Sequence, residues 1–581
     1  MTTIDYLIIL LYFAGLLTLG ATLGKKIKSS KEMFIAGRNS SWWLSGLSAY
    51  MTIFSASTFA IWGGVAYRSG VVAIVVALML GVASILVGLF LAGKWSRMKI
   101  NSPAEYLGVR FGRPTVRFYT IVGIIGRGVH TAVALYAIAI MVVALMPLPE
   151  GHMLADPKTG HLSVTWAILI MGAITFAYTA AGGFIAVLMT DVIQFAVLLA
   201  MIIIMAPLSI ASVGGVGEFI SRAPEGFFSL VSDKYSWGWM ILWCLLHFFM
   251  IGGDWPFVQR HISVPSPRDA KRSAYLVGAL YLTTPLIWYL PALAYRMIDP
   301  NANPEQAYML MSKHVLMAGM VGLMLAAMIS ATLSLVSGVL NVFANVFTYD
   351  IFKAFRPSAS DRSMIRVGRV FTFAYGFIIT MMAVLIPYAG GAERVVVATL
   401  TLVISPLFIP SIWGLFSKRM GQKAVWWSMG TTYVAAFLIK TGLVLEDFVN
   451  RHAAFVDAFI GLVFPVTILL LIELVLWKKE KDPGWDRLAS IMGGEKETPA
   501  GERKESAREA GRAYSRMAFN LMMGTYAAIG LIMMTIALAG GGDDGRLLLY
   551  GGIFLGVSLV AFLFYYLCHG KRKGFAGETE S

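Results

Sequence analysis

The sequence GGFIAVLMTDVIQF, residues 182–195, combines a membrane-length apolar run with a carboxylate. The run continues to about residue 212, which is long enough to cross a bilayer as a helix. Asp191 interrupts it, with Thr190 beside it and Gln194 one helical turn further on. A carboxylate in a spanning helix is costly, so it normally faces a partner or a watery cavity. Asp191 is therefore either a packing group that hydrogen-bonds to a neighbouring helix or part of a cation or proton pathway.

The composition of the whole chain indicates a polytopic membrane protein. Of its 581 residues, 58% are hydrophobic and 14% are charged, whereas a soluble protein carries about 25% charged residues. Its repeated apolar runs are too long and too uniform for barrel strands, so we expect an all-α fold. Cys244 and Cys568 lie in or at the end of such runs, which indicates neither a disulfide framework nor a thiolate metal site.

The basic residues are distributed as in a membrane protein, and we expect no nucleic-acid partner despite the net charge of +15. Lys and Arg are alternately abundant and scarce in successive loops. There are five in 24–41, six in 94–117 and ten in 478–516, whereas the loop between the fourth and fifth spans has only Lys158. This pattern follows the positive-inside rule. It predicts a cell-membrane protein with the N-terminus outside and the C-terminus in the cytoplasm, and therefore an odd number of spans.

We count about fifteen spans along the chain. Their boundaries follow the apolar runs and the loops that separate them. In chain order the predicted spans are 4–23, 42–66, 70–93, 117–147, 164–181, 182–212, 236–258, 274–299, 314–348, 367–388, 392–416, 424–442, 456–477, 516–539 and 547–567.

Two of these spans are interrupted about sixteen residues from their starts. The second carries hydroxyl residues in its middle and then Gly63–Gly64, whereas the seventh carries Gly252, Gly253 and Pro256. Broken helices line the binding sites of transporters, although small residues also serve close helix packing. A pair of interrupted spans at corresponding positions favours an inverted repeat.

The predicted organisation follows from that pair. Two repeats of five spans would cover 42–212 and 236–416. The flanking parts are an extra N-terminal span with its loop (1–41), additional spans (417–477), a charged cytoplasmic linker (478–516) and two C-terminal spans with a tail (517–581).

The ninth span carries small and polar residues on one helix face. Their spacings of 3, 4, 3, 4 and 4 keep them in a single stripe. Oxygen-bearing side chains suit a hard cation such as sodium, whereas a seam for helix packing would also use small residues. The stripe consists of Ala327, Ser330, Ser334, Ser337, Asn341 and Asn345.

The fourth span contains a deeply placed arginine. Arg127 lies ten residues beyond Arg117, which corresponds to a depth of roughly 15 Å, and His130 follows one turn later. No acidic residue in the same span can neutralise it. Arg127 therefore either pairs with a carboxylate or glutamine of another helix or presents its guanidinium to an anionic substrate.

Four segments resemble the sodium/solute symporter family, which includes symporters for glucose, proline, sialic acid and iodide. They are GGFIAVLMTDVIQF at 182–195, DWPFVQRHISVPSPRDAKRSA at 254–274, PAEYLGVRFG at 103–112 and NVFANVFTYDIFK at 341–353. The similarity runs over about residues 4–475. It implies a leucine-transporter-type 5+5 inverted repeat with extra flanking helices, working by alternating access with Na+ as the coupling ion.

The resemblance also implies sodium ligands. The main site would use the carbonyls of Met51, Phe54 and Ala331 and the hydroxyl of Ser334, but Leu335 stands where the family usually has a second hydroxyl. Asp191, Ser334 and Ser337 match an additional sodium site of some members. Thr332 lies two positions from Ser334, so in a regular helix it should point away from the site.

The solute site is expected near the broken spans. Arg127 is similar in position to a residue that contacts a carboxylate in the sialic-acid branch, whereas the polar side chains that bind sugars in the glucose branch are not evident. The predicted solute-binding residues are Arg127, Ser55, Thr58, Trp255 and Gln259.

We therefore predict a sodium-coupled symporter of a small organic solute, acting in a lipid bilayer as a monomer or weak oligomer. A proton-coupled or uncoupled transporter with Asp191 as the titrating group remains an alternative. A solute sensor built on the same scaffold is a second alternative. The sequence offers no nucleophile–base or metal constellation to support an enzyme.

Overall fold

The computed structural model describes residues 1–24, 38–182, 184–389, 391–440, 449, 451–476, 480–493, 502–539 and 545–574. Regular structure in these residues is helical, apart from the isolated bridges Pro147–His161 and Ala155–Leu162. Most of the basic loop 24–41, residues 494–501 of the predicted linker and the ends of the spans predicted at 424–442 and 456–477 lie outside the described residues.

Long helices coincide with most of the predicted spans. Their lengths follow from continuous apolar sequence without internal breaks. They are α1 (Thr3–Gly24), α5 (Val72–Phe90), α8 (Arg113–Leu145), α9 (Val164–Gly182), α10 (Phe184–Ser212), α14 (Pro267–Thr283), α18 (Met320–Val346), α20 (Asp361–Leu385), α23 (Gln422–Lys440), α26 (Phe464–Leu476), α28 (Glu502–Ala539) and α29 (Gly545–Gly574).

Shorter helices complete these spans or form the connections between them. They are α6 (Ala92–Arg97), α7 (Pro103–Phe111), α11 (Val216–Ser221), α15 (Pro285–Trp288), α16 (Leu290–Ile298), α17 (Ala307–Val315), η3 (Phe347–Phe352), α19 (Lys353–Phe355), η4 (Ile386–Ala389), α21 (Ala392–Thr399), η5 (Leu400–Ile404), α22 (Ser405–Trp413), α25 (Ala453–Ala458), η6 (Phe459–Val463) and α27 (Pro483–Gly493).

The number of spans supported by the described residues is lower than predicted. Ten helices are long and apolar enough to cross a membrane, and two bent pairs raise the number to twelve. The other three predicted spans coincide with α9, α23 and α29. The described apolar parts of α9 and α29 are Val164–Thr175 and Leu548–Leu563.

The two predicted interruptions are confirmed. In the second span, α3 (Trp42–Ile53) is followed by η2 (Thr58–Trp62) and α4 (Gly63–Ser69), with a bend of 59°. In the seventh, α12 (Trp237–Gly253) and α13 (Trp255–Ile262) meet at a bend of 55°.

Different residues cause the two breaks. Pro256 occupies the first turn of α13, where proline is tolerated, but it cannot continue α12 because it lacks an N–H group. At the first break, the hydroxyl of Ser55 accepts from the N–H of Ser57, so a side chain replaces helical hydrogen bonding. Phe54 and Asp254 both have extended backbone angles at these points.

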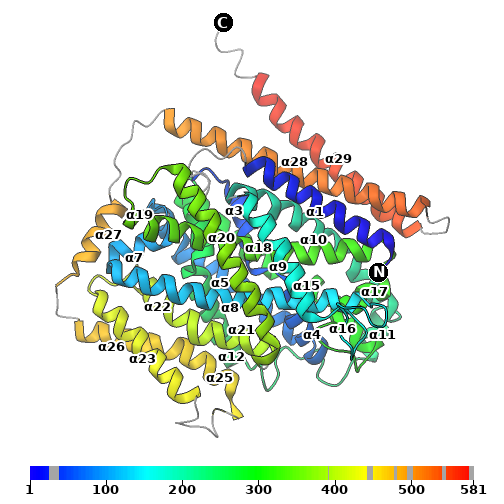
Figure 1. The fold of residues 1–581 in the computed structure, drawn as a ribbon, viewed down its shortest axis with the longest axis horizontal. Helices are drawn as coiled ribbons and strands as arrows, with labels where there is room; N and C mark the ends of the chain where they lie inside the picture. The colour runs from blue at the N-terminus through cyan, green and yellow to red at the C-terminus, as the bar shows by residue number, and fades with distance from the viewer. Residues whose placement is uncertain are drawn as a thin grey trace.

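Helix α18 forms the centre of the molecule, and all its residues are buried (Figure 1). It contacts α1, α3, α8, α10 and α20. Asp5 of α1 fixes its start, since the carboxylate accepts from the N–H groups of Gly319 and Gly322 at 2.7 and 2.8 Å. A carboxylate at a helix N-terminus satisfies free N–H groups and complements the helix dipole.

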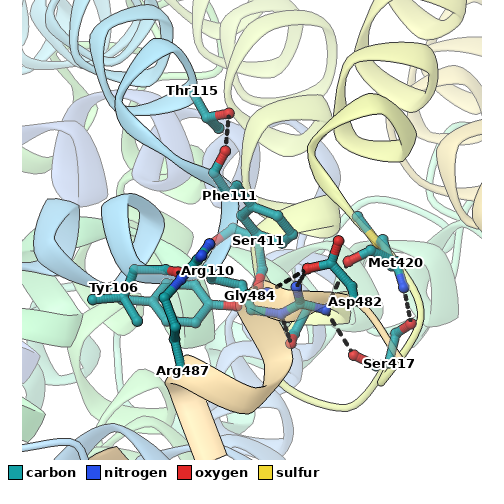
Figure 2. Close-up of polar contacts among 12 residues, drawn as sticks. Tyr106, Arg110, Phe111, Thr115, Ser411, Ser417, Met420, Asp482, Gly484 and Arg487 are labelled. Carbon is teal, nitrogen blue, oxygen red and sulfur yellow. Dashed lines mark hydrogen bonds and ion pairs between the residues drawn. The ribbon is translucent and has the colours of Figure 1, made fainter. Parts of the chain in front are cut away.

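The segment after the last repeat spans is attached to the main body through Arg110, as Figure 2 shows. The buried Arg110 guanidinium donates to the carbonyls of Gly414, Ser417 and Met420 at 3.2, 2.9 and 2.7 Å and pairs with Asp482 at 2.8 Å. We call these five residues the Arg110 cluster. Asp482 immediately precedes α27, a short helix within the predicted charged linker.

Candidate functional site

Asp191 lies at the junction of three helices. It is fully buried on α10 and accepts hydrogen bonds from the hydroxyls of Ser48 on α3 and Ser334 on α18. The contact with Ser334 is 2.6 Å long. The carboxylate therefore has partners on a broken helix and on the central helix. Its contact with Ser334 brings together two residues, Asp191 and Ser334, that were predicted to act at one sodium site.

Arg260 of α13 supplies a positive charge close to this carboxylate, with which it interacts electrostatically. Its Nε donates to the Ser48 hydroxyl at 3.2 Å, and Nη1 donates to the carbonyl of Pro256 at 2.9 Å. A Cβ atom at position 338 would lie 3.1 Å from Nη2, so Gly338 leaves space for the guanidinium. We call Asp191, Ser48, Ser334 and Arg260 the Asp191 centre.

Sequence reasoning missed Arg260, although it lies inside the quoted segment DWPFVQR. The predicted seventh span ended at residue 258, so Arg260 was counted with the basic loop that follows. Helix α13 extends to Ile262 and keeps Arg260 fully buried.

The polar stripe of α18 is hydrogen-bonded to several different elements. Such bonds are what a polar seam between buried helices requires. Ser330 donates to Tyr12 at 2.8 Å, Ser334 to Asp191 at 2.6 Å, Ser337 to the Ser334 carbonyl at 3.1 Å and Asn345 to the Asn101 carbonyl at 3.2 Å, while Asn341 accepts from Gln259 at 3.0 Å.

The residues of the predicted main sodium site are all buried around the first break. Met51, Phe54 and Ala331 are fully buried, and α3 ends at Ile53, so its last carbonyls have no partner within the helix. Leu335 is buried as well and brings no oxygen.

The expectation that Thr332 points away from this region is wrong. Its hydroxyl accepts from the N–H of Ala56 at 3.0 Å, directly in the break between α3 and η2. The argument from helical angles failed because the chain bends by 59° there and so reaches a second face of α18. Thr332 thus adds a hydroxyl oxygen at the break that sequence reasoning had set aside.

A cavity lies between the two broken helices and α8. Three of the predicted solute-binding residues, Ser55, Thr58 and Arg127, line it. The other two lie elsewhere. Trp255 packs against Phe343 with ring centroids 5.5 Å apart, and Gln259 donates to Asn341. The remaining lining is largely apolar, and its aromatic members are Trp62, Trp243, Phe257, Tyr281, Trp288 and Tyr289.

Arg127 forms an ion pair with Asp254, at the break between α12 and α13. Both side chains are almost fully buried. The absence of a carboxylate from the fourth span therefore did not leave the arginine without a partner, because the partner comes from a distant broken helix. Of the two interpretations kept open above, pairing within the protein is the one observed.

Two histidines lie beside this pair on the cavity wall. His247 Nδ1 is 2.9 Å from the carbonyl of Trp243, and because a carbonyl only accepts, Nδ1 carries the proton. Arg127 Nε and His130 Nδ1 have no hydrogen-bond partner within the described part of the chain. We call Arg127, Asp254, His130 and His247 the Arg127 centre.

Comparison with protein families agrees with this arrangement. A family model, the sodium:solute symporter family, matches residues 33–431 of the sequence. The chain belongs to this family. As a sodium:solute symporter family member it is a transporter and not an enzyme, as the sequence predicted.

Its relatives within the family carry different solutes in their names. It is 24% identical to the human sodium/myo-inositol cotransporter 2 over 77% of this chain and 70% of that one. It is 23% identical to the sodium/glucose cotransporter of Vibrio parahaemolyticus, with coverages of 84% and 93%. The sodium/sialic acid symporter NanT of Aliivibrio fischeri is 24% identical, with coverages of 65% and 75%.

The fold is similar to that of a solved family structure. A Na+-coupled sialic acid symporter in its substrate-bound, outward-open state superposes with a TM-score of 0.67 at 20% sequence identity, covering 82% of this chain and 98% of that one. The predicted all-α, leucine-transporter-type fold of the sodium:solute symporter family is confirmed.

Proposed function

We propose that this protein couples sodium entry to the uptake of a small organic anion across the cytoplasmic membrane. The observation that carries the proposal is the cavity between two broken helices, which brings hydroxyls of one break and the Arg127 centre of the other to a single space. The repeats 42–212 and 236–416 would move against each other around this cavity. The N-terminus would lie outside and the C-terminus in the cytoplasm, as the loop charges predict.

The residues at the first break fit a sodium ion in their donor chemistry. Sodium is a hard cation that prefers oxygen, and the region offers the carbonyls of Met51, Phe54 and Ala331 with the hydroxyl of Ser334. Asp191 accepts a hydrogen bond from Ser334, so its negative charge favours a cation nearby. Ser337 donates to the Ser334 carbonyl and would hold that turn of α18 in place.

The family usually has a second hydroxyl ligand at the position of Leu335, and this chain has to replace it or do without it. Leu335 provides no oxygen, but Thr332 places its hydroxyl at Ala56 within the same break. We propose that Thr332 supplies part of what Leu335 lacks. The proximity of Arg260 to Asp191 favours a single coupled sodium ion, because the guanidinium offsets part of the carboxylate charge.

The solute class follows from the donors that face the cavity. Arg127 Nε has no hydrogen-bond partner in the described protein, and the hydroxyls of Ser55 and Thr58 line the same space. These donors fit a carboxylate, and the aromatic wall fits an apolar or ring-shaped body. One relative carries sialic acid in its name, whereas the others carry myo-inositol or glucose.

The proposal is tested with purified protein in proteoliposomes. A thermal-shift screen of solutes, with and without sodium, first identifies a ligand, and uptake is then measured with sodium or proton gradients. We expect saturable uptake of a carboxylate that requires an inward sodium gradient. Uptake driven only by protons would move the coupling to the proton alternative, and solute binding without transport would indicate a sensor.

Two replacements of Arg127 distinguish the contribution of its planar guanidinium from that of its positive charge. Arg127→Lys keeps a cation beside Asp254 but loses the planar fork, whereas Arg127→Gln loses both. We expect apparent solute affinity to fall at least about tenfold in Arg127→Lys, because a bidentate contact is lost. Unchanged affinity for the solute in a folded Arg127→Lys protein, or a cationic solute, would contradict the assignment.

A further inference from the structure

A stripe of four exposed residues runs along α8 at intervals of one helical turn. Two are basic, Arg113 and Arg117, and the next two are apolar, Ile121 and Ile125, which are 59% and 51% exposed. Residues four apart share a helix face, and the four residues from Arg117 to Ile121 span roughly 6 Å. The stripe therefore passes from charged to apolar surface within about the distance that separates a lipid phosphate from its acyl chain region.

The stripe borders a pocket formed by α7, α8, the η3–α19 segment and α27. Four basic side chains line this pocket, namely Arg113, Arg117, Lys353 and Arg487. Ile121 forms its apolar end. Phe355, on the same pocket wall, is 78% exposed. The pocket thus has a cationic part and an apolar part in contact with each other.

Two carboxylates also line the pocket, but both are engaged by the protein. Glu105 accepts from the N–H of Asn101 at 2.7 Å, and Asp350 accepts from the Ser102 hydroxyl at 3.0 Å. In contrast, the four basic side chains are exposed, and none forms an ion pair with a described residue. With four basic and two acidic side chains, the lining of the pocket is net positive.

The contribution from α27 is held in place by the Arg110 cluster (Figure 2). Asp482 joins the start of α27 to Arg110, and Arg487 Nε donates to the carbonyl of Val109 on α7 at 3.0 Å. One nitrogen of Arg487 thus fixes the side chain beside α7. The remaining N–H groups stay available for a phosphate oxygen.

We propose that this pocket binds the headgroup phosphate of an anionic phospholipid. Basic pockets beside spanning helices favour such headgroups, because several cations gather around one phosphate while the acyl chains lie against apolar side chains. Arg113, Arg117 and Lys353 hold the phosphate, Arg487 closes the pocket from α27, and an acyl chain lies along Ile121 and Ile125. The site is independent of the transported solute and of the coupling ion.

The test uses the full-length protein in nanodiscs of phosphatidylcholine with a minor fraction of phosphatidylglycerol. Native mass spectrometry counts the phosphatidylglycerol molecules that stay bound after release. We expect Arg113→Gln/Arg117→Gln/Lys353→Gln to lower retention at least about tenfold, since each surface cation contributes roughly fivefold. The matched control is Arg362→Gln/Arg366→Gln/Arg369→Gln, which removes three exposed charges from α20 without touching the pocket.

A second pair of variants separates lipid from soluble phosphate. Ile121→Gln removes no charge but should lower phosphatidylglycerol retention severalfold, whereas Ile378→Gln, an exposed position on α20, should not. Equal losses in the control triple variant, or full retention in the pocket triple variant, would overturn the proposal. Displacement of the lipid by millimolar inorganic phosphate, with no effect of Ile121→Gln, would also overturn it and indicate a soluble phosphate ligand.

Discussion

The carboxylates of the two buried charge centres differ in how completely the protein satisfies them. In the Asp191 centre, the hydroxyls of Ser48 and Ser334 donate to the two carboxylate oxygens, and Arg260 lies close by without lining the cavity, although its Nη2 has no hydrogen-bond partner in the described protein. The Arg127 centre is a direct ion pair whose nitrogen and oxygen atoms are left partly without hydrogen bonds in the described protein. It also lies on the cavity wall.

This difference shows that burial of a charge is a poor guide to its role. Both centres are buried within spanning helices, and both contain one acid and one arginine. A carboxylate on α10 that accepts hydrogen bonds from both α3 and α18 suits the coupling of helix positions. A centre with free donors at a cavity suits recognition of a ligand, because a ligand can supply the hydrogen bonds that the protein does not.

The largest expected effect comes from breaking the Arg127 centre. Arg127→Gln or Asp254→Asn leaves the other charge buried without its partner, which costs about 3–5 kcal/mol in the free energy of unfolding. Removal of both charges in one variant should recover at least half of that loss. Urea unfolding in detergent micelles, followed by tryptophan fluorescence, measures these differences.

The two more exposed ion pairs of Glu393 serve as the control for this experiment. Glu393→Gln loses contacts with Arg68 and Lys234, whose side chains are largely exposed, and should cost less than about 1 kcal/mol per contact. If Arg127→Gln were no more destabilising than Glu393→Gln, the comparison between the centres would lose its basis.

Asp191→Asn should lower stability less than Arg127→Gln does, but it should strongly reduce the coupling of uptake to sodium. Asparagine has nearly the same shape, so the protein should still fold and insert, although one serine hydroxyl loses its acceptor. Loss of the negative charge should reduce sodium-stimulated uptake at least about tenfold, since a difference of 1.4 kcal/mol suffices.

The control for Asp191→Asn is Asp233→Asn, which makes the same chemical change at an exposed loop position. Uptake is compared over a range of sodium concentrations in proteoliposomes. Normal uptake with unchanged ion dependence in Asp191→Asn would make Asp191 a packing group and remove the proposed coupling role of its centre.

The smallest effect is expected from Leu335→Ser, which adds one oxygen near the first break. An added contact of hydrogen-bond strength corresponds to roughly a threefold to tenfold lower half-saturating sodium concentration. Leu333→Ser is the matched control, because Leu333 is equally buried but points to another face of α18. Leu333→Ser should lose the same apolar packing as Leu335→Ser, but it should not add an oxygen ligand for sodium.

The sodium dependence of uptake by the native protein decides how the result for Leu335→Ser is interpreted. Absence of sodium dependence in both the native protein and Leu335→Ser would contradict sodium coupling. Half-saturation by sodium as low in the native protein as in Leu335→Ser would mean that Thr332 already completes the site or that Leu335 does not face the ion. Thr332→Val distinguishes these, since it removes the hydroxyl at Ala56.

The sequence predicted those features that depend on local chemistry. Apolar runs gave the long helices, and Pro256 with the Ser-rich segment at 55–58 gave the two breaks. Partners across the fold were not predictable, because periodicity does not say which helices meet. The pairing of Arg127 with Asp254 and the position of Arg260 beside Asp191 both depend on such meetings, as does the contact of Thr332 with a bent chain.

The Arg110 cluster limits how this end of the molecule can open. One guanidinium holds the end of α7, three carbonyls of the chain after α22 and the carboxylate that precedes α27. Three segments far apart in the sequence are therefore held together by one side chain. If the proposed transport cycle moves the helices at this end, we expect the Arg110 cluster to move as a unit, and it provides a reference for measuring displacements of α3 and α13.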